Sequence, residues 1–277
     1  MSIIDTHIHL VSGDREKFPL HPDGAYQPQK SYPIEDYIPV MEDAGISGAV
    51  LVHCEPYLDD HRYTLHCLAQ EPKRLKGTCL FAPHDSEGPA KMAALIEKAG
   101  PGTIVAFRIH AYRDDGIPDF ESPELKALWG RAVELGLCVQ LHFAPRYAGA
   151  FAKIYRQFSD CTVILDHLGR PGQGNAVVYE DVAALAEFEN CYLKFSAISS
   201  ASSEPWPHRD VKPIVSRMAS RFGAERILYG GGYSSGTTAP EYRKAPELVE
   251  ILLGHLTAED KERILGLNAI RLFGFEV

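Results

Sequence analysis

Residues 3–10 read Ile-Ile-Asp-Thr-His-Ile-His-Leu, an apolar run rich in β-branched residues that predicts a buried strand. A doubly wound nucleotide-binding sheet would follow such a strand with a glycine-rich phosphate loop, and no such loop follows Leu10. Two histidines stand near the end of the run instead. The stretch therefore favours another parallel α/β architecture, with ionisable side chains where the first strand ends.

The rest of the chain repeats this alternation of a short apolar run and a longer segment of helical period. Buried parallel strands are predicted at residues 3–10, 48–54, 75–81, 103–109, 137–143, 161–167, 191–197 and 226–230. Helices are predicted at residues 34–44, 59–70, 89–98, 123–135, 147–158, 179–187, 211–221, 246–253, 258–265 and 268–273. This order predicts a single α/β domain over residues 1–277, a (β/α)₈ TIM barrel, with an open doubly wound sheet as the alternative.

Composition limits the classes of partner. The chain has 277 residues, is 45% hydrophobic and carries a formal net charge of -9, so it can bury a large core and would be repelled by nucleic acids and anionic membranes. No run approaches the roughly 18 apolar residues of a membrane span. The six cysteines form no C-x-x-C pair and look like reduced core residues of a cytoplasmic protein. A small-molecule partner is expected, and assembly into a homo-oligomer stays open.

Histidines gather at the predicted strand ends. Because side chains alternate along a strand, Asp5, His7 and His9 should face the barrel axis, and His142 and His167 end the fifth and sixth strands. A lone histidine is more often a hydrogen-bonded core or surface residue, but four of them at one barrel mouth indicate function. Imidazole binds zinc, and a neutral histidine can move protons or polarise a carbonyl.

Three further histidines, His53, His84 and His110, lie at or near strand ends. The sequence pairs none of them with a partner, so they are weaker candidates than the four above.

Cationic side chains also follow several strands. Loop arginines are often merely solvated, but basic residues at the mouth of an acidic protein suit an anionic substrate, since guanidinium binds carboxylate through two parallel hydrogen bonds. Lys194 shares a strand face with Ser196 and, if buried, needs a carboxylate partner. The candidate substrate-binding residues are Arg108, Arg113, Arg146, Tyr147, Arg170 and Lys194.

These motifs resemble the amidohydrolase-2 group of the amidohydrolase superfamily, which contains (β/α)₈ hydrolases, decarboxylases and lactonases that act with or without metal. The likeness runs nearly end to end. Within the group, the chain is similar to the branch that opens lactones of sugar acids or of aromatic-degradation intermediates, and that branch includes lactone isomerases. The motifs are I-I-D-T-H-I-H-L (3–10), A-F-R-I-H (106–110), V-Q-L-H-F (139–143), V-I-L-D-H-L-G-R-P (163–171), Y-L-K-F-S (192–196) and L-N-A-I-R-L-F-G-F (267–275).

The resemblance implies roles for particular residues. His7, His9, His142 and His167 match the family's histidine cluster, which binds a divalent metal such as zinc or, in metal-free lactonases, helps to polarise the carbonyl. The family ends its eighth strand with G-S-D, whose aspartate binds metal and activates water, whereas Gly232 occupies that place here. The metal site is therefore expected to be weak, partly occupied or empty.

Three interpretations of Gly232 stay open: an engineered or inactivating change, a different base, or a reaction that needs no activated water. The nearest substitute carboxylates in the sequence are Glu55, Asp85, Asp114 and Asp166.

The resulting prediction is a lactonase that opens a carboxylate-bearing lactone. The alternatives are a lactone isomerase or decarboxylase on the same scaffold, and an inactive barrel that binds a carboxylate ligand.

Overall fold

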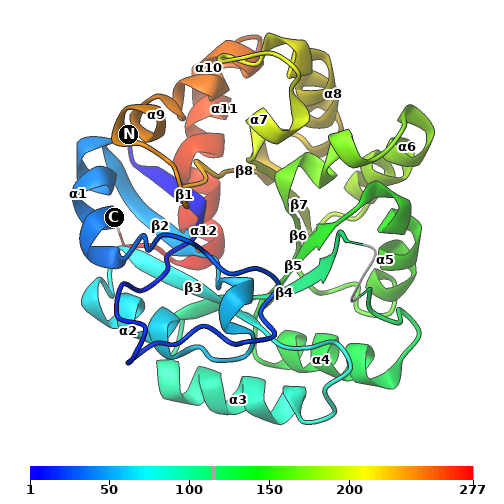
Figure 1. The fold of residues 1–277 in the computed structure, drawn as a ribbon. Helices are drawn as coiled ribbons and strands as arrows, with labels where there is room; N and C mark the ends of the chain where they lie inside the picture. The colour runs from blue at the N-terminus through cyan, green and yellow to red at the C-terminus, as the bar shows by residue number, and fades with distance from the viewer. Residues whose placement is uncertain (114–116, 277) are drawn as a thin grey trace.

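The computed structural model describes residues 1–113 and 117–276 and contains eight parallel strands that follow one another in chain order (Figure 1). Each predicted strand is present, with ends shifted by a few residues. The strands are β1 (Ile3–Ile8), β2 (Ile46–Leu51), β3 (Leu75–Leu80), β4 (Ile104–Ala111), β5 (Cys138–Phe143), β6 (Val163–Leu165), β7 (Cys191–Phe195) and β8 (Ile227–Tyr229).

Parallel pairing joins each strand to the next, from β1 to β8. Side chains of β1 link the two end strands: Thr6 Oγ1 donates to the carbonyl oxygen of Tyr229 at 2.7 Å, and the backbone N–H of Gly231 donates to Asp5 Oδ1 at 2.8 Å. The predicted (β/α)₈ barrel is confirmed, and the open doubly wound sheet is excluded.

Helices surround the strands on the outside of the barrel (Figure 1). The ten predicted helices appear as α1 (Ile34–Asp43), α2 (Arg62–Gln70), α3 (Gly88–Ala99), α4 (Pro123–Glu134), α5 (Ala148–Tyr155), α6 (Ala176–Ala184), α8 (Lys212–Phe222), α10 (Glu247–Leu253), α11 (Ala258–Glu262) and α12 (Asn268–Phe273). Two short helices were not predicted, α7 (Ile198–Ala201) and α9 (Ala239–Lys244). The start of α9 is fixed by a capping box between Thr238 and Glu241.

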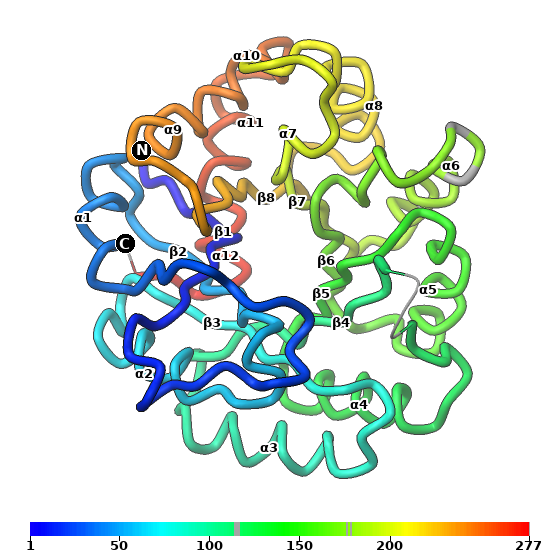
Figure 2. Tube along the Cα trace, in the orientation of Figure 1, coloured from blue at the N-terminus to red at the C-terminus, as the bar shows by residue number. Residues whose placement is uncertain are grey.

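Short helical turns fill several connections, and some of them follow strands at the barrel mouth. They are η1 (Glu55–Tyr57), η2 (Pro145–Tyr147), η3 (His167–Gly169), η4 (Pro171–Gln173), η5 (Leu185–Glu187), η6 (Arg209–Val211), η7 (Ala224–Arg226) and η8 (Arg263–Leu267). The long connection between β1 and α1 passes close to the loops after β2 and β4 (Figure 2), where His21 N–H donates to Pro56 O at 2.8 Å.

The barrel interior is layered along its axis. The layer nearest the start of the strands is apolar and packs against the C-terminal segment; it contains Ile4, Val50, Val105, Ala106, Cys138, Ile164, Leu228, Ala269, Phe273 and Phe275. Two positions further along four strands, alternation brings polar side chains into the same buried interior. These are Arg108, Gln140, Asp166 and Lys194.

Asp5 does not share this interior, which corrects the expectation from strand alternation. Its neighbour Ile4 faces the apolar layer, and the pairing of β1 with β2 shifts register between Asp5 and Ile8. The hydroxyl of Tyr242 in α9 donates to Asp5 Oδ2 at 2.7 Å. Asp5 therefore lies on the helix side of β1, and the irregularity after it lets His7 and His9 reach the barrel mouth.

Two observations bear on compartment and membrane. The six cysteines are buried free thiols. Every helix in the described ranges is too short or too polar to cross a membrane.

Candidate active site

The two histidines of the first motif meet at their ring edges. His7 Nε2 lies 3.2 Å from His9 Nε2, and His9 Nδ1 lies 2.9 Å from the carbonyl oxygen of Val52. Because a carbonyl only accepts, Nδ1 of His9 carries a proton and its Nε2 presents a lone pair to His7.

The structure brings the four predicted histidines into one cluster. The ring centroids of His7 and His167 are 4.5 Å apart, and those of His167 and His142 are 5.0 Å apart. His110 extends the cluster, with its ring 5.3 Å from that of His142. Strand alternation could have found His110, because it shares the inward face of β4 with Arg108; its partner, Glu55, follows a different strand.

Burial makes this cluster neutral near pH 7. It lowers the pKa of His9 to about 4 and that of His167 to about 3, and it holds the pKa of His7 and of His142 well below 6.5. Nearby cations, Arg108 above all, add to this effect at His9 and His142. Each ring is therefore uncharged near pH 7, with one nitrogen that can donate a proton and one that can accept a proton.

Asp166 is the anionic centre beneath the histidines. Its Oδ2 accepts from Arg108 Nε at 2.9 Å and from Gln140 Nε2 at 2.9 Å, and its Oδ1 lies 3.4 Å from Lys194 Nζ. Burial alone would raise the pKa of this carboxyl, but the Lys194 and Arg108 cations outweigh it and hold the pKa well below 3.8. Asp166 is thus an ionised partner of two cations.

Lys194 and Arg108 were both predicted to contact substrate, and in the structure both are directed at protein groups. Their side chains are 0% and 4% exposed. Lys194 Nζ donates to Thr6 O at 2.8 Å and lies 3.4 Å from His7 Nδ1. Burial lowers the pKa of Lys194 to about 8, although Asp166 opposes that shift.

The other predicted arginines lie nearer the surface. Arg170 places an Nη1 on His142 Nε2, and its guanidinium sits 4.8 Å above the Tyr112 ring. Arg113 Nη2 lies 3.8 Å from Glu55 Oε1. Arg146 is exposed and lies over the ring of Tyr147, which is half-buried. Arg170 is therefore the predicted arginine that reaches both the histidine cluster and the mouth.

The backbone after β6 is held in an uncommon conformation. His167, Leu168 and Arg170 all have left-handed φ values, of 56°, 55° and 57°. Non-glycine residues in this region cost of order 1–3 kcal/mol each, and such strain clusters at functional sites. This backbone conformation turns the His167 ring toward Ser196. The Oγ of Ser196 lies 2.9 Å from His167 Nδ1 and accepts a hydrogen bond from the His167 backbone N–H at 3.2 Å.

The three glycines after β8 differ in what they require. A Cβ on Gly230 would lie 2.8 Å from the Cβ of Ser196, and one on Gly231 would lie 2.6 Å from the Tyr229 hydroxyl, so both positions need glycine for space. Gly232 has a φ of +81°, and a Cβ placed on it would meet no heavy atom of the described residues within 4 Å. A side chain at the place of the family aspartate would therefore have room, at the expense of backbone strain.

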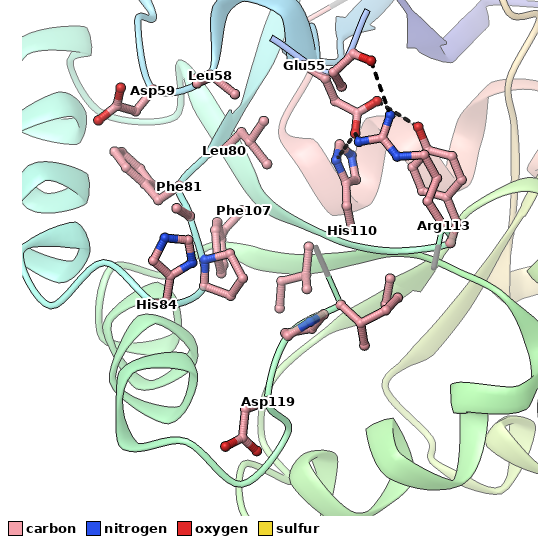
Figure 3. Close-up of a pocket in the computed structure, with 18 of the residues that line it drawn as sticks. Glu55, Leu58, Asp59, Leu80, Phe81, His84, Phe107, His110, Arg113 and Asp119 are labelled. Atoms are coloured by element: carbon pink, nitrogen blue, oxygen red, sulfur yellow. Dashed lines mark hydrogen bonds and ion pairs between the residues drawn. The ribbon is translucent and has the colours of Figure 1, made fainter. Parts of the chain in front are cut away.

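Two cavities open beside the histidines. The first, of about 820 Å³, is lined by His7, His9, His167 and the loops after β7 and β8; we call it the β8 cavity. The second, of about 550 Å³, lies over β3 and β4 and is lined mostly by apolar residues, with Glu55, His110 and Arg113 at one end (Figure 3); we call it the β4 cavity.

The other predicted carboxylates differ in their placement. Glu55 lies against His110, with Oε1 2.6 Å from Nδ1. Asp85 instead forms a surface ion pair with Lys91 at 2.7 Å, away from the histidines. Asp114 lies outside the described residues.

The donor set fits a metal ion only in part. Ligand atoms of His7, Asp166 and His167 all lie within 4.8 Å of one another. However, Asp166 already pairs with two cations, and the lone pair of His9 Nε2 favours the proton of His7 on the Nε2 that faces it. His142 stands apart, because its Nε2 faces Arg170. A metal ion would have to compete with these contacts for the same donor atoms.

The barrel fold and the histidines at its strand ends occur in a chain that matches one family model over nearly its whole length. The family model described as amidohydrolase matches residues 4–275. The chain belongs to the amidohydrolase family. This match confirms the resemblance inferred from the motifs. Membership of the family identifies the chain as a hydrolase with a (β/α)₈ barrel.

Relatives and structures give this amidohydrolase a closer context. A 4-sulfomuconolactone hydrolase of Rhizobium radiobacter is 28% identical over 278 residues, which cover 98% of this chain and 89% of the relative. A D-galactarolactone isomerase of Agrobacterium fabrum is 24% identical and covers 98% of this chain and 90% of its own. A Pseudomonas putida structure, solved as a candidate 2-pyrone-4,6-dicarboxylic acid hydrolase, has a TM-score of 0.82 at 23% identity and covers 100% and 98% of the two chains.

A divalent metal occurs in the same fold elsewhere. An amidohydrolase of Burkholderia multivorans with bound zinc has a TM-score of 0.79 at 14% identity, over 99% of this chain and 100% of that one. At such identity the likeness concerns the fold alone.

Proposed function

We propose that this amidohydrolase is a lactonase that opens a lactone bearing a carboxylate. The observation that carries the proposal is a buried cluster of neutral histidines with the cation of Arg170 at its edge. The histidines can polarise a lactone carbonyl, and the Arg170 guanidinium can hold a nearby carboxylate. The lactone hydrolases among the relatives support the same chemistry.

His167 is the proposed donor to the lactone carbonyl. Ser196 Oγ accepts from the His167 N–H, so its hydroxyl proton is free to donate to Nδ1 at 2.9 Å. The proton of the neutral ring then resides on Nε2, and His167 lines the β8 cavity. A donor fixed there stabilises negative charge that develops on the carbonyl oxygen as water adds.

Arg170 is the proposed anchor for the substrate carboxylate, with Arg113, Arg146 and Tyr147 as further candidates from the rim. Its guanidinium is partly desolvated and is steadied by the face of Tyr112. Arg108 and Lys194 act indirectly in this scheme, by holding Asp166 and His7.

The test is turnover of a panel of sugar-acid lactones, muconolactones and pyrone carboxylates by the purified protein, before and after chelation, followed by acid release. Hydrolysis of at least one carboxylate-bearing lactone is expected, and it would exclude an inactive binding protein. A panel without any turnover would overturn the proposal. Bound zinc, with the predicted ligands His7, His9, His142 and His167, is proposed to be weak or absent, and metal analysis of the same samples tests this.

Isomerisation is the second candidate, favoured by the missing carboxylate at Gly232. Proton NMR of the products separates the two reactions, because an isomerase yields a new lactone and a lactonase yields an open hydroxy acid.

A further inference from the structure

Lys244 lies in the wall of the β8 cavity, the same cavity that His167 lines. It is the only lysine or arginine among the described residues of that wall. Its neighbour Arg243 forms an ion pair with Asp43, whereas the ammonium of Lys244 forms no ion pair with any residue that the structure describes. A cation left unpaired on a cavity wall is available to an anionic ligand.

Helix α9 holds this lysine in place. The capping box of Thr238 and Glu241 fixes the start of the helix, and the Tyr242 hydroxyl ties it to Asp5 Oδ2 at 2.7 Å. Glu241 is also the only carboxylate among the described residues of the cavity wall. Its Oε2 accepts from the backbone N–H of Thr238 at 2.9 Å and from the Thr238 hydroxyl at 2.6 Å. The acid in the wall is therefore engaged by the helix cap and leaves Lys244 for a ligand.

Trp206 supplies an apolar face to the same cavity. Its side chain is 40% exposed, whereas the other tryptophan of the chain, Trp129, is fully buried. The Trp206 ring lies 6.2 Å from the ring of His208, which also lines the cavity. A large, stiff aromatic side chain on a cavity wall binds a flat ring at little cost in conformational entropy. The β8 cavity thus offers a surface for a ring as well as a cation.

The β8 cavity is larger than a lactone ring needs. Its volume of about 820 Å³ lies in the upper part of the roughly 300–1,000 Å³ that drug-sized ligands occupy. In the β4 cavity, by contrast, the one lysine or arginine of the described wall is Arg113, which lies 3.8 Å from Glu55 Oε1 (Figure 3). Space for a substituent and an unpaired cation therefore coincide in the β8 cavity.

We propose that Lys244 and Trp206 form a second substrate subsite, in which Lys244 binds an anionic group of the lactone and Trp206 packs against its ring. This inference rests on the lactonase function proposed above, whose carbonyl donor, His167, lines the same cavity. Arg170 contacts His142, which lies outside the described wall of that cavity, so the two cations serve different groups of the substrate. The preferred substrate is then a lactone with two anionic groups.

Benzoate and isophthalate, flat six-membered rings with one and two carboxylates, test the subsite without turnover. Isophthalate should change the tryptophan fluorescence of the wild-type protein in a saturable way and should bind more tightly than benzoate, because it engages two cations. Trp206→Phe keeps a ring for stacking and should still bind isophthalate in calorimetry. Its fluorescence should not respond, since the remaining tryptophan, Trp129, is fully buried.

Lys244→Gln isolates the charge. The Kd for isophthalate should rise about three- to tenfold, between the effect of a solvent-exposed ion pair and that of a buried charged hydrogen bond. The Kd for benzoate should change less, because its single carboxylate can still bind Arg170. Lys244→Arg should keep the wild-type preference for isophthalate. Lys73→Gln is the control, because Lys73 is exposed and precedes β3 at the opposite end of the barrel, and it should leave both Kd values unchanged.

Turnover then connects the subsite with the reaction. In Lys244→Gln, KM for a lactone with two carboxylates should rise by more than kcat falls, because the lost contact binds the substrate away from the carbonyl. KM for a lactone with one carboxylate should rise less.

The outcomes separate this subsite from the proposed function. Wild-type affinity for isophthalate in Lys244→Gln, or no preference of the wild-type protein for isophthalate over benzoate, would refute the role of Lys244. Binding that leaves the fluorescence of the wild-type protein unchanged would place the ring away from Trp206 and refute the subsite. Isophthalate binding as expected, without turnover of any lactone, would instead overturn the lactonase and leave the β8 cavity as a binding site for ring dianions.

Discussion

The ammonium of Lys194 lies 3.4 Å from Nδ1 of His7. An ammonium can only donate, so it favours the His7 tautomer whose proton is on Nε2, whereas Asp166 Oδ1, 3.6 Å from the same Nδ1, favours the other. The lone pair of His9 Nε2, 3.2 Å from His7 Nε2, accepts the Nε2 proton and adds to the effect of Lys194. The same geometry opposes a metal ion, which needs lone pairs on both Nε2 atoms. Lys194 thus orders the histidine pair as a hydrogen-bonded unit.

Removing this ammonium should make the site a better metal ligand. In Lys194→Met, Asp166 loses one of its two cations and His7 can carry its proton on Nδ1, so zinc affinity should rise by at least tenfold. Calorimetric titration of chelator-treated protein with zinc measures it. The exposed Lys73→Met is the control and should bind zinc as the wild type does; equal affinity in all three proteins would refute the competition.

Acid should destabilise the fold through its buried histidines. The pKa of His9 and of His61 is about 4 and that of His167 about 3, all lowered mainly by burial from 6.5. Between these values and 6.5 the unfolded chain binds more protons, so their stabilisation is complete above pH 6.5 and is lost as the pH falls toward 4. At pH 5 each histidine contributes a loss of roughly 2 kcal/mol.

Urea unfolding at pH 7.5 and pH 5 measures this loss. His61→Gln, which replaces a histidine outside the cluster, should show a smaller difference between the two pH values than the wild type. A free energy of unfolding that is the same at both would contradict the expectation.

The fold was predictable because the strand and the helix of each βα unit have distinct hydrophobic patterns in the sequence. The eight apolar runs and ten helical segments appear with small shifts at their ends. Helix α9 was not predicted, although Thr238 and Glu241 have the spacing of a capping box at its start. Asp5 was misplaced because strand alternation assumes a regular strand, and β1 is irregular between Asp5 and Ile8.

The candidate site was predictable where its residues lie at strand ends, and less so where residues from different strands pair across the barrel. Position along the strands located His7, His9, His142 and His167 correctly at the mouth. Strand position could not show that Asp166 forms ion pairs with Arg108 and Lys194, because strands β4, β6 and β7 bring these three residues together from distant parts of the chain. For the same reason the pairing of His110 with Glu55 was not visible.

Arg170 should be the main determinant of carboxylate binding. Arg170→Gln removes a charge-assisted hydrogen bond, which typically costs ~1.5–3 kcal/mol, so KM for a carboxylate lactone should rise roughly ten- to a hundredfold. Arg146→Gln, at an exposed position, should change KM less. Steady-state kinetics on the same lactone and on its methyl ester give the comparison, and an unchanged KM in Arg170→Gln would show that the carboxylate binds elsewhere.

Gly232 allows a test of whether a carboxylate at this position can act as a base. Gly232 lines the β8 cavity with His7, His9 and His167, and the space around its Cβ position is open. Aspartate is among the side chains that tolerate a left-handed φ, at about 1 kcal/mol of strain. Gly232→Asp should therefore raise kcat for lactone hydrolysis at least tenfold over the wild type, because a positioned carboxylate can accept the proton of the attacking water.

The matched control is Gly232→Asn. Asparagine has nearly the same shape and the same tolerance of positive φ, but its amide is not a base, so it should leave kcat at the wild-type level. Thermal melting checks that both variants fold. If the aspartate and asparagine variants gain equally, the gain comes from the backbone of the β8 loop rather than from proton transfer, and position 232 has no latent role as a base in this barrel.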